Sequence, residues 1–268
     1  MTIPYELAYG RRERSDRRHT DDLNESCVVR RYPSTVQHEG DRRGRDALAG
    51  LRDGSPLEDI RATLAAFAAL VGDDQRSNEL RSATGGRVDL SLPNHRDAVL
   101  NWLRQWGCRH LRRADHARSS KAMLAWWKGY RPDIPPSNVT LDRLDAVALS
   151  DAGRAHAALA GSLAARRRHG DGEVDVVFGS TAAAKAMFAL RPLVFPPWDE
   201  PIRVAFGWTG RDPADYEAFL GMAKDALDGL SRRAGVPVEQ LPEAFGRPGS
   251  SSAKIVDEYL WITLTRQA

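Results

Sequence analysis

The stretch that most constrains how this chain can fold is residues 174–208, where an apolar run, a helical segment and a proline-rich break follow one another. Gly179 marks a turn after the apolar run, and residues 180–190 have the composition of a helix. The proline pair at 196–197 forbids helix and keeps the chain extended. A new helix can begin at Asp199, so its carboxylate is held in a defined place relative to both helices.

The same stretch contains a series of short motifs in a fixed order. They are a glycine turn, Ser-Thr-Ala, Phe-Ala-Leu, Arg-Pro, Phe-Pro, a single aspartate and Ile-Arg, which stand at Gly179, Ser180–Ala182, Phe188–Leu190, Arg191–Pro192, Phe195–Pro196, Asp199 and Ile202–Arg203. In this order they resemble the catalytic hairpin of the helix-hairpin-helix DNA glycosylases. The match covers roughly an eighth of the chain, and the usual Gly-x-Gly of the turn is reduced here to one glycine.

The resemblance implies a mainly α fold, a helix-hairpin-helix DNA glycosylase-like helical domain with few or no strands. It also implies hydrolysis of the N-glycosidic bond of a modified base in DNA, after the base has been extruded from the stack. Asp199 is the expected catalytic residue, because an ionised carboxylate can stabilise an oxocarbenium-like centre and orient a water. Gly179, Ser180, Thr181 and Arg203 are the expected DNA-binding residues of the hairpin.

Ser180 stands where bifunctional members of the family carry the lysine that attacks the sugar. A serine cannot form a Schiff base, so a monofunctional, water-using enzyme is expected. Lys185 lies five positions further along, and the nucleophile role is not transferred to it. It is left as a partner of Asp199, a phosphate contact or, by default, a solvated helix lysine.

Trp198, Trp126, Trp127 and Lys185 are the candidate residues of a base pocket. Trp126 and Trp127 are adjacent on a predicted helix and therefore point about 100° apart. One of them could then reach solvent and stack on an extruded base, while packing in the core is the alternative.

The reduced hairpin and the tryptophan-rich front half are similar, in a broad sense, to bacterial anti-phage glycosylases. Those enzymes excise glucosylated hydroxymethylcytosine, and this base is the expected substrate. A pyranose needs a wide cleft with an aromatic platform, because its C–H face packs on an indole ring. A base-excision repair glycosylase for damaged bases remains an alternative, as does a non-catalytic helical DNA-binding protein on the same scaffold. Burial of Asp199 in salt bridges would favour the non-catalytic protein.

Three consecutive arginines, Arg166, Arg167 and Arg168, precede the hairpin at the end of a helix predicted over residues 150–168. Cations near a helix C-terminus are favourable in any case. Beside a hairpin that approaches DNA they would also neutralise phosphates. We therefore include all three among the expected DNA-binding residues.

Residues 1–54 are dense in charge and lack apolar periodicity, which predicts a basic, loosely ordered arm. Residues 55–268 are expected to form one helical domain that starts at the helix signal Ser55-Pro56. Apolar residues at helical spacing predict about nine helices. A short strand is predicted over residues 88–92.

The net charge of +3 permits DNA as a partner without demanding it. Cys27 and Cys108 are the only cysteines, so a four-cysteine zinc site or iron–sulfur cluster is excluded. We expect no metal and no cofactor. The sequence has no run of 18 apolar residues, so we expect no membrane segment and a cytoplasmic location. We also expect the protein to be a monomer.

Because Ser180 replaces the family lysine, the product DNA should carry intact abasic sites that break only on alkali or heat treatment. Borohydride added during the reaction should trap no covalent enzyme–DNA adduct, since no amine occupies the nucleophile position. Gel electrophoresis of borohydride-treated reactions measures this. An efficient adduct would mean that Lys185 or another amine has taken over the role.

Overall fold

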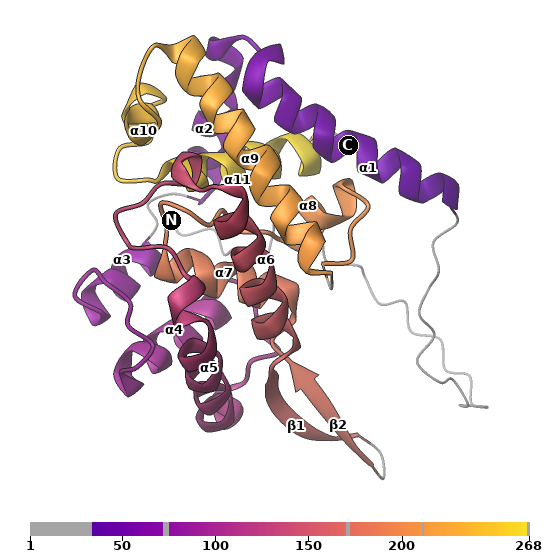
Figure 1. Cartoon of the computed structure of the whole chain (residues 1–268), viewed down its shortest axis with the longest axis vertical. Helices are drawn as coiled ribbons and strands as arrows, with labels where there is room; N and C mark the ends of the chain where they lie inside the picture. Colours follow the sequence, from indigo (N-terminus) through magenta and orange to yellow (C-terminus); the bar gives the residue numbers. More distant parts are fainter. Residues whose placement is uncertain (1–33, 72–74, 170–171, 211, 267–268) are drawn as a thin grey trace.

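The computed structural model describes residues 34–71, 75–169, 172–210 and 212–266. This part of the chain is mainly helical (Figure 1), as expected from the sequence. The α-helices are α1 (Ser34–Ala49), α2 (Leu57–Val71), α3 (Gln75–Ala83), α4 (Pro93–Gln105), α5 (His116–Tyr130), α6 (Ala146–Gly161), α7 (Gly179–Leu190), α8 (Glu200–Ala205), α9 (Pro213–Ala234), α10 (Leu241–Ala244) and α11 (Ser252–Thr265). Strands β1 (Leu163–His169) and β2 (Gly172–Val177) form one antiparallel hairpin.

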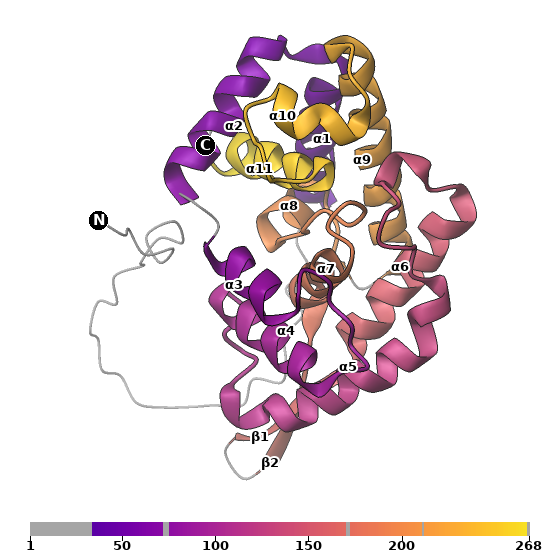
Figure 2. The same ribbon diagram turned by 90° about the vertical axis from the view of Figure 1, so that its left-hand side faces the viewer.

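Helix α7 lies at the centre of the molecule. Figure 2 shows it between one group of helices that contains α1, α2, α10 and α11 and a second group that contains α3, α4 and α5. Every residue from Ala182 to Phe188 is buried, as expected for a helix that is apolar on all sides. The small alanines allow close approach, and α7 packs against α4 and α6, while α6 also packs against α9.

Folded structure begins earlier than the expected start at Ser55. Residues 1–33 of the expected arm lie outside the described residues, but α1 and the following π-helical turn η2 (Gly50–Gly54) are regular helix. Leu48 and Leu51 are buried in the core, and η2 packs against α9. The boundary at 54/55 is therefore wrong, because a few apolar residues at helical spacing anchor this highly charged segment.

The prediction of one helix over residues 150–168 is also wrong for residues 162–168. Helix α6 ends at Gly161, and the arginine run continues as β1, which pairs with β2. Inter-strand hydrogen bonds satisfy the backbone that a longer helix would have satisfied internally. Residues 88–92, predicted as a strand, form turns, and α3 occupies part of the predicted loop before them.

The packing of η2 on α9 can be tested at two glycines in the interior of α9. A Cβ added to Gly229 would lie 2.7 Å from the backbone oxygen of Arg52 in η2, whereas one added to Gly221 would meet nothing within 4 Å. Gly221→Ala should therefore raise the free energy of unfolding by roughly 0.5–1 kcal/mol, because alanine favours helix. Gly229→Ala should lower it by about 1–3 kcal/mol through overpacking.

Urea denaturation of both variants measures these changes. An equal stabilisation by both substitutions would show that residues 50–54 do not pack on α9.

Candidate active site

Asp199 is the N-cap residue of α8, yet its carboxylate does not cap that helix. The Oδ1 atom lies instead 2.9 Å from the Nζ atom of Lys185, which projects from the central helix α7. Both side chains are almost completely buried, with 7% of Asp199 and 3% of Lys185 exposed. The default expectation of a solvated Lys185 is thus wrong, and the alternative that it pairs with Asp199 is confirmed.

The surroundings of this ion pair leave acceptor capacity on the aspartate. Lys185 Nζ donates a hydrogen bond of 2.8 Å to the backbone oxygen of Trp106, just beyond the end of α4. Although Lys185 is within ion-pair distance of Asp199 Oδ1, no donor among the described residues meets that oxygen with hydrogen-bond geometry. A buried carboxylate oxygen of this kind is an acceptor for a water or a ligand group.

A second buried ion pair, Lys254 with Asp257 on α11, lies close to the first. The ring of Trp106 is common to both pairs, because Lys185 Nζ lies 5.6 Å and Lys254 Nζ 4.9 Å from its centroid. Burial raises the pKa of Asp257 to about 6; the nearby Asp199 also raises it, while Lys254 and Lys185 oppose the shift. The four charges therefore form one interacting cluster around a half-buried indole.

Cys108 belongs to the surroundings of the same cluster. Its thiol is buried, and burial raises its pKa to about 11, with Lys185 lowering and Asp199 raising it further. A thiol with so high a pKa is protonated at neutral pH and is a poor nucleophile. Cys108 is therefore a packing residue beside the pair.

The residues expected to contact DNA through the hairpin use their polar groups within the protein. Ser180 Oγ donates to the backbone oxygen of Gly210 at 2.6 Å. Thr181 Oγ1 accepts from Arg203, whose guanidinium also donates to the backbone oxygen of Trp198, both at 2.9 Å. These bonds fix the start of α7 to the segment before Asp199. Gly179 adopts a φ of 74°, which favours glycine, at the turn between β2 and α7.

Trp198 is fully buried and packs behind Asp199 rather than lining an opening. Its indole lies 5.5 Å from the ring of His156 and 5.2 Å from that of Tyr216. Burial lowers the pKa of His156 to about 4, so this side chain is neutral at pH 7. His156 Nε2 bonds the backbone oxygen of Ser180 and must carry the proton there.

Trp126 and Trp127 are both buried on α5, with 4% and 5% exposure. The expectation that one of them reaches solvent is wrong, because both indole rings lie on the buried side of this helix and the other side faces solvent. Trp126 donates its indole N–H to the backbone oxygen of Ala155 on α6. Trp198, Trp126 and Trp127 therefore offer no exposed aromatic platform. Trp106, which lies beside Lys185, is half-buried.

The three arginines of β1 are not equivalent. Arg166 pairs with Asp175 across the hairpin, and Arg167 pairs with Asp115 at 2.9 Å. Arg168 is exposed, and none of the described acidic residues pairs with it. Two of the three expected phosphate contacts are thus already neutralised within the protein.

Sequence reasoning missed Lys254 and Asp257, which enter the charge cluster from α11. A usable signal existed, because they lie three positions apart in a helix that is apolar on nearly every side. The same signal applies to Lys185, the only charged residue of an alanine-rich helix. A charge in such a helix must be buried, and a buried charge requires a partner.

Among the described residues, no group of histidine, cysteine and acidic side chains is placed to hold a metal ion. None of the helices in the same ranges is long and apolar enough to span a membrane.

Lys185→Met should lower the free energy of unfolding by about 3–5 kcal/mol, because it leaves the buried Asp199 without its main counter-charge. The matched control is Lys128→Met on exposed α5 surface, which should change it by less than about 0.5 kcal/mol. Adding Asp199→Asn to Lys185→Met should restore much of the loss. Equal effects of the two single substitutions in denaturant titrations would contradict the buried pair.

Comparison of this chain with protein-family models, with curated proteins and with solved structures finds no match. Its function is therefore inferred from the chemistry of its own residues.

Proposed function

We propose that this protein is a monofunctional DNA glycosylase on a helix-hairpin-helix glycosylase-like scaffold, which hydrolyses the N-glycosidic bond of a modified base. The observation that carries the proposal is the buried Asp199 Oδ1 atom, which accepts no hydrogen bond from the described residues although Lys185 Nζ lies 2.9 Å away. Asp199 also stands at the position that the motif order of residues 179–203 would give to the catalytic carboxylate.

A buried ion pair is an expensive feature that stability alone does not require. Replacing such a pair by apolar residues is often neutral or stabilising, so its presence calls for another reason. Charged groups with strong mutual interactions gather at functional sites more often than elsewhere. The pairing of Asp199 with Lys185, next to Lys254 and Asp257, fits that pattern.

The carboxylate has the properties that the reaction needs. The Lys185 ammonium lies 2.9 Å from the Asp199 carboxylate, and an ionised carboxylate stabilises the positive charge that develops at C1′. Asp199 Oδ1 accepts no hydrogen bond from the described residues, so it can accept one from a water once the side chains around it move. In the reaction the C1′–N bond breaks, the water oxygen bonds to C1′, one water proton is lost and the departing base takes up a proton.

The substrate class in this proposal is a modified base. Trp198, Trp126 and Trp127 were expected to pack on the sugar of glucosylated hydroxymethylcytosine, but all three side chains are buried. That base remains the first to be tested, followed by oxidised and alkylated bases in duplex DNA. Trp106, half-buried and in contact with Lys185, is the aromatic residue we assign to stack on an extruded base.

A second candidate function is a DNA-binding protein that keeps the scaffold without catalysis. The observation that favours it is the low exposure of Asp199, 5%, together with its salt bridge. A substrate sugar could reach the carboxylate in this arrangement only after the side chains around it move.

The test is mass spectrometry of bases released from glucosylated, oxidised, alkylated and unmodified DNA. The wild-type protein should release one modified base, and Asp199→Asn should slow that release by about 10²–10³-fold in single turnover. Asp199→Asn leaves Lys185 as a buried charge without its partner, which can destabilise the fold. The double variant Asp199→Asn with Lys185→Met, which removes both charges, is therefore measured as well, and thermal unfolding shows whether each variant is folded. Asp225→Asn, on the exposed face of α9, is the matched control.

Near-wild-type release by a folded Asp199 variant would remove this residue from the mechanism. Tight DNA binding without release of any base by the wild type would leave the non-catalytic function in its place.

A further inference from the structure

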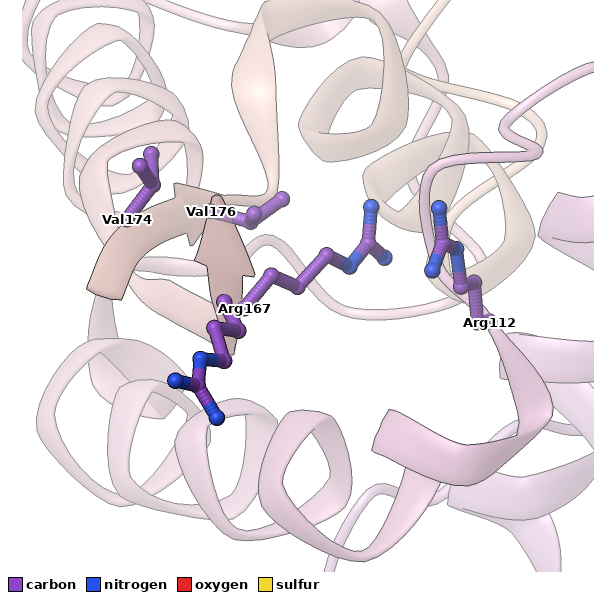
Figure 3. Close-up of a pocket in the computed structure, with 5 residues that line it drawn as sticks. Arg112, Arg167, Val174 and Val176 are labelled. Carbon is purple, nitrogen blue, oxygen red and sulfur yellow. The ribbon is translucent and has the colours of Figure 1, made fainter. Parts of the chain in front are cut away.

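We infer that the pocket between the β1–β2 hairpin and the segment before α5 binds backbone phosphates of DNA. The cavity has a volume of about 530 Å³, and it is lined by Arg112, Arg167, Arg168, Val174 and Val176. It lies apart from the Asp199 cluster, and the inference rests on the proposed function only in taking DNA as the ligand. Figure 3 shows Arg112 on the opposite side of the opening from the two valines.

Hydrogen bonds and an ion pair fix the two walls of this pocket relative to each other. Arg167 donates from β1 to the backbone oxygen of His110 and to the carboxylate of Asp115. His110 in turn donates through Nε2 to the backbone oxygen of Phe178, at 2.8 Å, where β2 passes into α7. Arg112 lies between these anchoring points, so its Cα position is set before any ligand binds.

The distribution of acidic partners leaves positive charge at the opening. Arg112 and Arg168 are both exposed, and within the described ranges neither forms an ion pair or a hydrogen bond. Glu173 faces Arg168 across the hairpin, but the two side chains are not paired. Arg167 is neutralised by Asp115. Arg168 follows Arg167 along β1 and lies in register with Glu173, so its guanidinium leaves the strand on the other face of the hairpin.

The remaining lining is apolar and exposed. Val174 is 47% exposed although it lies on a strand, and the side chains of Val174 and Val176 share one face of β2. Arg112 beside this apolar patch, with Arg168 on the other face of the same hairpin, matches a ligand with phosphates joined by apolar sugar faces. A DNA backbone has this chemistry, and guanidinium groups bind phosphate with two parallel hydrogen bonds.

The hairpin connects this pocket directly to the candidate active site along the chain. Phe178, the last residue before α7, is buried and lies seven positions before Lys185. Phosphates held at Arg112 and Arg168 would fix a DNA strand beside the helix that carries the Asp199 partner.

The test is the salt dependence of binding of a fluorescently labelled, unmodified DNA oligonucleotide to the full-length protein. Arg112→Gln and Arg168→Gln should each weaken binding and reduce the log–log salt slope by about one unit, as expected when one phosphate contact is lost. Arg232→Gln is the matched control, because it removes the same charge from the exposed end of α9. Arg166→Gln, which removes an arginine already paired with Asp175, should reduce the slope by less than either pocket variant.

Slopes of Arg112→Gln and Arg168→Gln equal to those of Arg232→Gln would overturn the phosphate pocket. Binding of an RNA of the same sequence more than about tenfold tighter would overturn DNA as the ligand. Base release is measured separately at saturating protein. If only the phosphate-pocket inference is wrong, the wild-type protein still releases the base. If only the glycosylase proposal is wrong, no base is released, but the salt slopes of the pocket variants still fall as expected.

Discussion

The interaction on which the rest of this structure depends is the ion pair between Lys185 and Asp199. Lys185 lies on the central helix α7, and Asp199 comes from a separate segment beyond a proline-rich break. Either charge alone at this depth would cost several kcal/mol, so the two segments must meet for either to be tolerated. The pair therefore couples the position of α8 to that of the central helix.

The environment of the pair explains why it is fixed in one arrangement. Thr181 and Arg203 connect the start of α7 to the chain at Trp198, and Ser180 connects it to Gly210 beyond α8. The Asp199 carboxylate does not cap α8, and it pairs with Lys185 instead. A carboxylate held in this way needs little reorganisation when charge develops beside it, which is the condition for electrostatic catalysis.

The hairpin illustrates how acidic neighbours decide which cations are available to a ligand. Arg166, Arg167 and Arg168 are adjacent in sequence, but Asp175 and Asp115 neutralise the first two. Arg112, distant in the sequence from Arg168, becomes its neighbour through the fold. A run of arginines in a sequence therefore overestimates the positive charge of the surface when carboxylates from other segments pair with it. The run also does not reveal arginines from distant segments that lie nearby in the fold.

The sequence by itself determined the helical class and the place of Asp199. The composition of residues 180–190 predicted α7, and the signal Ser55-Pro56 predicted the start of α2. Pro196 and Pro197 required the break that precedes α8. These features follow from local rules, since helix periodicity and proline geometry act within a few residues. The β1–β2 hairpin was not predicted, even though Asp171-Gly172 followed by alternating valines is a hairpin signature in the sequence.

Only the tertiary structure decided which charged residues lie together. Lys185 lies 69 positions before Lys254, and the two share the ring of Trp106 only because α7 and α11 pack around it. The burial of Trp126, Trp127 and Trp198 was settled in the same way, by helices that cover them from elsewhere in the chain. Burial and charge pairing depend on the sum of contacts from distant segments, and no local pattern contains that sum.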